Sequence, residues 1–176
     1  MLARILYNII GRKQALPESE LNAMAGEGDI LMAAGLKPGG MGRIFRRSVR
    51  IRQVDAGSCN GCELEIHAIN NPIYNCEKYG IHFTASPRFA DLLLVTGPVT
   101  RNMEIALRRT YNSTPVPKLV VAAGDCACNG GIFGETYASL GGIDKVIPVD
   151  ARIPGCPPTP LQLMQGLTRL LEGAGK

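Results

Sequence analysis

Short, continuously apolar runs constrain the fold of this chain more than any other feature. Residues 92–96 and 118–123 are almost entirely apolar. A strand that is buried on both faces needs such a run, as in a parallel sheet covered by helices. Segments with helical periodicity alternate with the strand-like runs, which predicts an α/β fold with a parallel sheet and helices on both faces. The predicted strands are 49–54, 81–84, 92–96, 118–123 and 145–149, and the predicted helices lie near 62–70, 101–112 and 160–172.

The first 48 residues differ in composition from the rest of the chain. Glycines are frequent between residues 26 and 42 and break up the short apolar patches there, which resists regular structure. We therefore predict an irregular N-terminal extension, residues 1–48, and an α/β domain, residues 49–176. Apolar residues between 2 and 10 recur at helical spacing, so the extension is expected to contact a partner or a membrane surface.

Composition and charge exclude several classes of protein. With 45% hydrophobic and 19% charged residues, wholesale disorder is not expected. No run reaches the ~18 uninterrupted apolar residues of a membrane-spanning helix. Gly11, Arg12 and Lys13 interrupt the first apolar stretch before an export signal develops, which predicts a cytoplasmic protein. A net charge of +4 with only 5% aromatic residues and no Trp does not favour nucleic-acid binding.

Six cysteines in a reducing compartment indicate metal or redox chemistry more than structural disulfides. Five of them lie in three segments that follow predicted strands: Cys59 and Cys62, then Cys126 and Cys128, then Cys156. In an open parallel sheet the carboxyl ends of the strands share one edge, which is where such folds bind ligands. We therefore expect these segments to converge.

The cysteine segments favour one 4Fe-4S cluster held by Cys59, Cys62, Cys126 and Cys156. A cubane takes four thiolates, and the Gly and Pro residues beside each cysteine suit loops that approach an inorganic core closely. Structural zinc is the second interpretation, although only Cys59-x-x-Cys62 forms the pair that zinc sites commonly use twice. A thioredoxin-like dithiol at Cys59-x-x-Cys62 would leave the other segments unexplained.

The two remaining thiols, Cys76 and Cys128, are expected to be ordinary small apolar residues. The spacing Cys126-Ala-Cys128 nevertheless lets either thiol of that pair reach inward. Glu65 lies three residues after Cys62 and can share a helix face with it. It is a candidate for coupling proton movement to cluster reduction, with an ordinary helix-surface carboxylate as the alternative.

From about Cys59 to Gly166 the chain resembles a known family of small iron-sulfur subunits (20 kDa, B-type). Membrane-bound, energy-converting (group 4) NiFe hydrogenases, formate hydrogenlyase and respiratory complex I share this subunit. The motifs occur in the same order at residues 59–65, 86–97, 106–111, 124–131 and 149–158. The resemblance implies a flavodoxin-like domain with one 4Fe-4S cluster next to the active site of a larger subunit. Such a protein transfers electrons and is not catalytic alone.

Within this family, the spacing of the first cysteine motif favours a hydrogenase. Complex I members carry two adjacent cysteines there, whereas this chain has Cys59-x-x-Cys62. A complex I-like quinone oxidoreductase is the alternative, and a zinc-stabilised binding module is a further one. The resemblance implies a NiFe large subunit, a ferredoxin-like iron-sulfur subunit and membrane subunits as partners. It also implies a peripheral position on the cytoplasmic face of the cell membrane.

Overall fold

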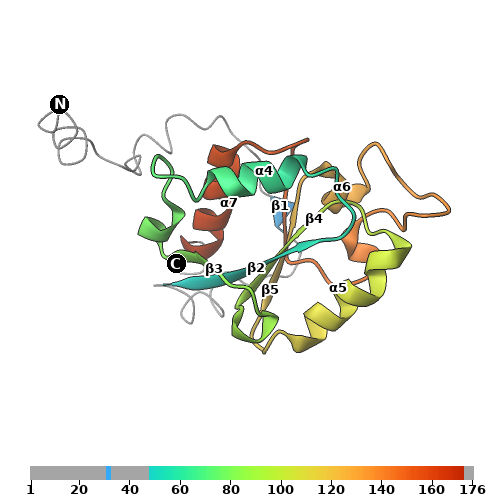
Figure 1. Cartoon of the computed structure of the whole chain (residues 1–176), viewed down its shortest axis with the longest axis horizontal. Coiled ribbons are helices and arrows are strands. Elements are labelled where there is room, and N and C mark those ends of the chain that lie inside the picture. The colour runs from blue at the N-terminus through green and yellow to red at the C-terminus, as the bar shows by residue number, and fades with distance from the viewer. Residues whose placement is uncertain (1–30, 33–47, 173–176) are drawn as a thin grey trace, which may run out of the picture.

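The computed structural model describes residues 31–32 and 48–172, which contain a six-stranded sheet flanked by helices (Figure 1). Neighbouring strands follow the order β1-β6-β5-β4-β2-β3. The strands are β1 (Leu31–Met32), β2 (Val49–Asp55), β3 (Ile81–Phe83), β4 (Leu92–Thr96), β5 (Leu119–Ala123) and β6 (Ala151–Ile153).

The five strands from β2 to β6 pair in parallel throughout. Counted from β2, their spatial order is 2-1-3-4-5, the order of flavodoxin-like sheets. The predicted α/β fold with a parallel sheet is therefore confirmed. The short β1 adds an antiparallel edge beside β6, with Leu31 opposite Arg152. It lies in the predicted N-terminal extension, whose other residues up to 47 lie outside the described part, so the proposed division into extension and domain stays a prediction.

Helices cover both faces of the sheet, as the alternation of segments predicted. Figure 1 shows α4 (Gly61–Ala68) and α7 (Pro160–Glu172) on one side and α5 (Arg101–Ser113) on the other. The first core joins Ile66 of α4 to apolar side chains of β2, β4 and α7. The second core joins Leu107 of α5 to the opposite side of the strands and to the short helix α6 (Asp125–Asn129).

Four predicted strands agree with the structure to within one residue at each end, because their apolar runs match burial in the sheet. Every residue of β4 and β5 is buried. The three predicted helices also correspond to α4, α5 and α7. Three short 3-10 helices complete the described elements: η1 (Cys76–Tyr79), η2 (Pro87–Phe89) and η3 (Ile143–Lys145). In the part of the chain that the structure describes, no helix is long and apolar enough to cross a bilayer.

The predicted strand at 145–149 is wrong, because the last strand is β6 and η3 ends at Lys145. Val146 and Ile147 are apolar since they pack in the second core, a role that apolar periodicity cannot distinguish from a strand. Pro148 has no N–H to donate to a sheet. Asp150 instead holds the chain just before β6 beside β5, because its Oδ2 accepts the N–H of Val120 at 2.8 Å.

Candidate metal centre

Three cysteine-bearing segments meet at the carboxyl edge of the parallel strands. The first follows β2, the second is α6 after β5, and the third follows β6. Backbone hydrogen bonds join the second segment to the third: Gly124 N–H donates to Ile153 O and Asp125 N–H to Gly155 O, both at 2.8 Å. The N–H of Gly155 donates in return to Asp125 Oδ1 at 2.8 Å. The convergence expected from parallel topology is therefore present in the backbone of the second and third segments.

The first segment forms a tight turn into α4. Asp55 Oδ1 accepts the N–H groups of Gly57 and Ser58, each at 2.7 Å, and Ser58 Oγ accepts the N–H of Asn60 at 3.2 Å. Asn60 is left-handed, with φ 70°, and α4 begins at the next residue. This turn leaves Cys59 exposed in the loop and places Cys62 half-buried in the first turn of the helix.

Glycines allow the thiols to lie against the backbone of neighbouring segments. A Cβ on Gly124 would lie 2.5 Å from Cys62 Sγ and 3.4 Å from Gly155 O. A Cβ on Gly131 would lie 2.8 Å from Cys126 Sγ. Both glycines have positive φ, +89° and +53°, so hydrogen is the only side chain that the geometry and the space both allow.

Electrostatic interactions show that the thiols of the three segments lie near one another. The pKa of Cys62 is raised to about 12, first by burial and then by the nearby Glu63, Cys126, Cys59 and Cys156. Burial also raises the pKa of Cys126, followed by Cys156 and Cys59. Without a metal these two groups are therefore thiols at neutral pH, and metal binding would release their protons.

The other two cysteines are directed elsewhere. Cys76 is fully buried in the first core and donates to Asn70 Oδ1 at 3.1 Å. The thiol of Cys128 donates to Ala122 O at 3.7 Å and is 3.9 Å from Ile153 O, so it is turned toward the sheet. Burial raises the pKa of each to about 11. None of the four converging thiols contributes to the pKa shift of Cys76 or Cys128. These two cysteines therefore form a group distinct from Cys59, Cys62, Cys126 and Cys156.

The chemistry of the donors suits an iron-sulfur cluster. Thiols from three segments lie near one another, and glycine backbones leave room beside two of them. Thiolates are the ligands that such clusters use. Thiolates also bind zinc, and among the described residues no three or more His, Cys, Asp or Glu side chains are grouped to hold a single metal ion.

The carboxylates of α4 differ in their surroundings. Glu65 is half-buried, and its predicted proton-coupling role stays a prediction. Glu63 is only 6% exposed, and neither of its oxygens has a hydrogen-bond partner in the described part of the chain. Sequence reasoning missed Glu63. The signal was present, because residues 63, 66 and 69 recur at helical spacing and Ile66 and Ile69 are both fully buried.

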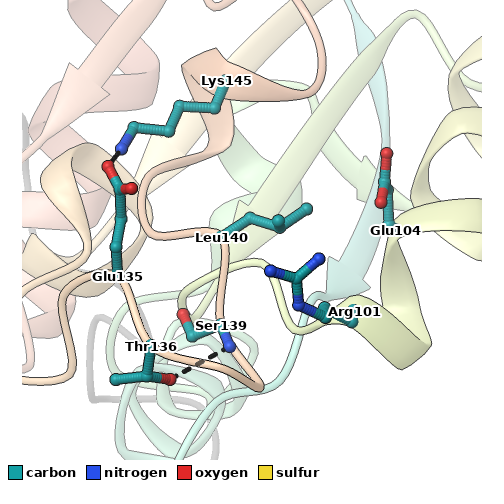
Figure 2. Close-up of a pocket in the computed structure, with 7 residues that line it drawn as sticks. All are labelled: Arg101, Glu104, Glu135, Thr136, Ser139, Leu140 and Lys145. Carbon is teal, nitrogen blue, oxygen red and sulfur yellow. Dashed lines mark hydrogen bonds and ion pairs between the residues drawn. The ribbon is translucent and has the colours of Figure 1, made fainter.

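A surface pocket of about 390 Å³, whose lining includes none of the cysteines, lies beside the loop that follows α6. Figure 2 shows its charged side chains, with Lys145 forming an ion pair with Glu135. Arg101 Nε donates to Tyr137 O at 2.7 Å, and Glu104 pairs with Arg108 at 3.1 Å. The contacts of Lys145 with Glu135 and of Arg101 with Tyr137 therefore tie the loop to η3 and α5.

Comparisons with known proteins show the family of this chain. A family model described as "NADH ubiquinone oxidoreductase, 20 Kd subunit" matches residues 59–170. Formate hydrogenlyase subunit 7 of Escherichia coli K12 is 47% identical over 127 residues, covering 72% of this chain and 50% of that protein. The chain thus spans about half the length of that relative. A "probable membrane-bound hydrogenase subunit" of Pyrococcus furiosus is 43% identical over 134 residues, covering 76% and 80%.

A solved structure has a similar fold. A chain in the structure of the membrane-bound sulfane sulfur reductase, described as an archaeal respiratory membrane complex, superposes with a TM-score of 0.66. Its sequence identity to this chain is 36%, and the match covers 76% of this chain and 74% of that one.

Proposed function

Because the chain belongs to the family of the 20 kDa subunit of NADH:ubiquinone oxidoreductase, which hydrogenase-type complexes share, we propose that it is an electron-transfer subunit of such a complex. It holds one 4Fe-4S cluster on Cys59, Cys62, Cys126 and Cys156. The cluster lies next to the active site of a membrane-bound NiFe hydrogenase, whose large subunit carries the nickel.

One observation carries this proposal: three segments distant in sequence bring four thiols to one sheet edge, while the other two thiols are turned into the protein. When bound, a 4Fe-4S cluster accepts and donates single electrons. The chain's own residues would hold it and shield it. Glycines 124 and 131 let two of the sulfurs lie against backbone, and backbone N–H groups near them can stabilise the net negative charge of a thiolate-bound cluster.

Hydrogenase is favoured over quinone reduction by the first cysteine motif. Cys59-x-x-Cys62 has the hydrogenase spacing, and two relatives are named as hydrogenase or formate hydrogenlyase subunits. A complex I-like quinone oxidoreductase remains the second candidate, because the matching family model carries the complex I description. In either complex we propose a peripheral position on the cytoplasmic face of the membrane, beside a ferredoxin-like iron-sulfur subunit and membrane subunits.

In the intact complex, purified anaerobically, hydrogen gas is expected to reduce this cluster without added NADH or quinol. The physical reason is that a cluster beside the NiFe site is the first electron acceptor from it. Electron paramagnetic resonance measures the reduction, and argon in place of hydrogen is the control. Reduction by a quinol but not by hydrogen would favour the quinone oxidoreductase. One zinc per chain with no iron would instead establish the zinc-binding module.

The loop that follows α6 carries exposed apolar side chains next to the cluster segment. Ile132 is 86% exposed and Tyr137 is 93% exposed, and Phe133 lies between them. Figure 1 shows this loop projecting away from the sheet. It begins at Gly131, which lies against Cys126 Sγ. A partner on this surface would therefore lie beside the cluster, as electron transfer requires, so we propose that the loop docks the large subunit.

Ile132→Asp is expected to reduce the large subunit that co-purifies with this chain by roughly tenfold or more, because burying a charge in a dry interface is costly. Val116→Asp is the matched control, since Val116 is 84% exposed but lies just before β5, at the opposite edge of the sheet. Quantitative mass spectrometry of the affinity-purified complex measures the ratio. Equal loss in both variants, or loss in neither, would contradict docking at this loop.

A further inference from the structure

The pocket beside the loop that follows α6 has one wall that hydrogen bonds fix in place. Ser139 is only 7% exposed, its Oγ donates to Gly134 O at 3.0 Å, and it accepts the N–H of Gly141 at 3.1 Å. Thr136 Oγ1 accepts the N–H of Ser139 at 3.1 Å (Figure 2). The space of about 390 Å³ is therefore a preformed feature of the chain.

The charges that line this pocket do not balance. Glu135 forms an ion pair with Lys145, and Glu104 forms one with Arg108 at 3.1 Å. Arg101 is the remaining charged residue of the lining, and none of the ion pairs in the described part of the chain involves it. The pocket therefore holds one positive charge that no carboxylate of these residues compensates.

The guanidinium of Arg101 has donors to spare. An arginine carries five N–H donors in a planar fork, and here Nε is used, since it donates to Tyr137 O at 2.7 Å. Figure 2 shows the two terminal nitrogens directed away from the backbone of α5, into the space between Leu140 and Glu104. Two such nitrogens can bind one carboxylate through a pair of parallel hydrogen bonds.

The same side chain is tied to the surface on which we propose that the large subunit docks. The carbonyl of Tyr137 holds Arg101, and the side chain of Tyr137 is 93% exposed. A partner that covers Tyr137 also takes water from the guanidinium bonded to it. A guanidinium that loses water without gaining an acceptor is unfavourable. The partner therefore needs to supply an acceptor, and a carboxylate is the acceptor that also compensates the charge.

We propose that the pocket receives a carboxylate side chain, an Asp or a Glu, of the large subunit, held by the terminal nitrogens of Arg101. This rests on the proposed function, and in particular on docking of the large subunit at the loop that follows α6. The exposed apolar side chains of the loop supply the apolar part of the contact, and Arg101 supplies the charged part. The two carboxylates of the pocket have cations of their own and do not compete for Arg101.

The test measures how fast the intact complex, immobilised through a tag on this chain, releases its large subunit. The sodium chloride concentration is raised from about 0.1 M to about 1 M, which shortens the Debye length from ~10 Å to ~3 Å. At the low concentration Arg101→Gln is expected to speed release roughly tenfold or more, because the partner's carboxylate is left covered and unpaired. At the high concentration the difference is expected to narrow to about threefold or less, since salt already weakens the pair. Arg101→Lys keeps the charge without the fork, so release at an intermediate rate is expected.

Arg109→Gln is the matched control, because Arg109 is exposed on the same helix and does not line the pocket. Equal release in the two Gln variants would overturn the proposal. An effect of Arg101→Gln that is the same at every salt concentration would also overturn it, because the side chain would then only brace Tyr137. If Arg101→Gln instead separated two copies of this chain, the occupant would be a second copy and the proposal would be wrong.

Failure of this inference can be distinguished from failure of the proposed function. Faster release in Ile132→Asp but not in Arg101→Gln would overturn the carboxylate contact and leave docking at the loop in place. A complex that shows the expected loss in Arg101→Gln but contains no iron-sulfur cluster would refute the proposed electron transfer and support the carboxylate contact. Iron and sulfide analysis of the unsubstituted complex separates these results.

Discussion

Replacing Cys59, Cys62, Cys126 or Cys156 by alanine is expected to abolish the 4Fe-4S cluster, whereas Cys76→Ser and Cys128→Ser are expected to keep it. Four thiolates complete the coordination of a cubane, and losing one exposes an iron to solvent and oxidant. The iron content should fall from about four per chain to background in the first group and stay at about four in the second. Iron analysis and electron paramagnetic resonance of the dithionite-reduced protein measure the outcome.

The second segment gives this experiment its sharpest internal control, because it contains two cysteines one residue apart. The thiol of Cys128 donates to Ala122 O, on the sheet side, while Cys126 Sγ lies against Gly131. If Cys128→Ser abolished the signal while Cys126→Ser retained a four-iron cluster, the assignment of Cys126 as the ligand would be wrong.

Gly124→Ala is expected to prevent cluster binding although it alters no proposed ligand. The new Cβ would lie 2.5 Å from Cys62 Sγ, closer than any real contact of this kind, and Gly155 O lies 3.4 Å away on another segment. Gly124 also has φ 89° and ψ 155°, a conformation nearly restricted to glycine. Either Cys62 or the third segment must move, and either movement displaces a proposed ligand. We expect at least roughly a tenfold loss of bound iron, since a cubane needs all four thiolates in place.

Gly134→Ala separates this effect from backbone strain alone. Gly134 also has positive φ, +54°, but a Cβ there would meet nothing within 4 Å. Its substitution is expected to lower the free energy of unfolding by about 1–2 kcal/mol through the left-handed backbone and to leave the iron content unchanged. Urea unfolding and iron analysis measure the two quantities. Full iron content in Gly124→Ala would show that the contact with Cys62 is not required for the cluster.

Most of the fold could be predicted because buried strands appear in the sequence as runs of apolar residues. The runs at 92–96 and 118–123 are apolar on consecutive residues, and the corresponding strands β4 and β5 are buried throughout. The run at 145–149 is also apolar, but Val146 and Ile147 pack against a sheet face without joining it. Apolar periodicity records that a side chain is buried and does not record whether its backbone pairs with a strand.

The sequence by itself determined the chemistry of this protein: the number of cysteines, their glycine-rich surroundings and their order after parallel strands, which together predict a shared sheet edge. Only the tertiary structure decided which side chains meet there and which do not. It turned Cys128 toward Ala122 and Ile153, and it buried Glu63 where no described residue forms a hydrogen bond with its carboxylate. The physical reason is that composition and spacing follow from the chain alone. The direction of a thiol and the partner of a carboxylate depend on atoms that distant segments bring, and those are specified only when the sheet and its helices have packed.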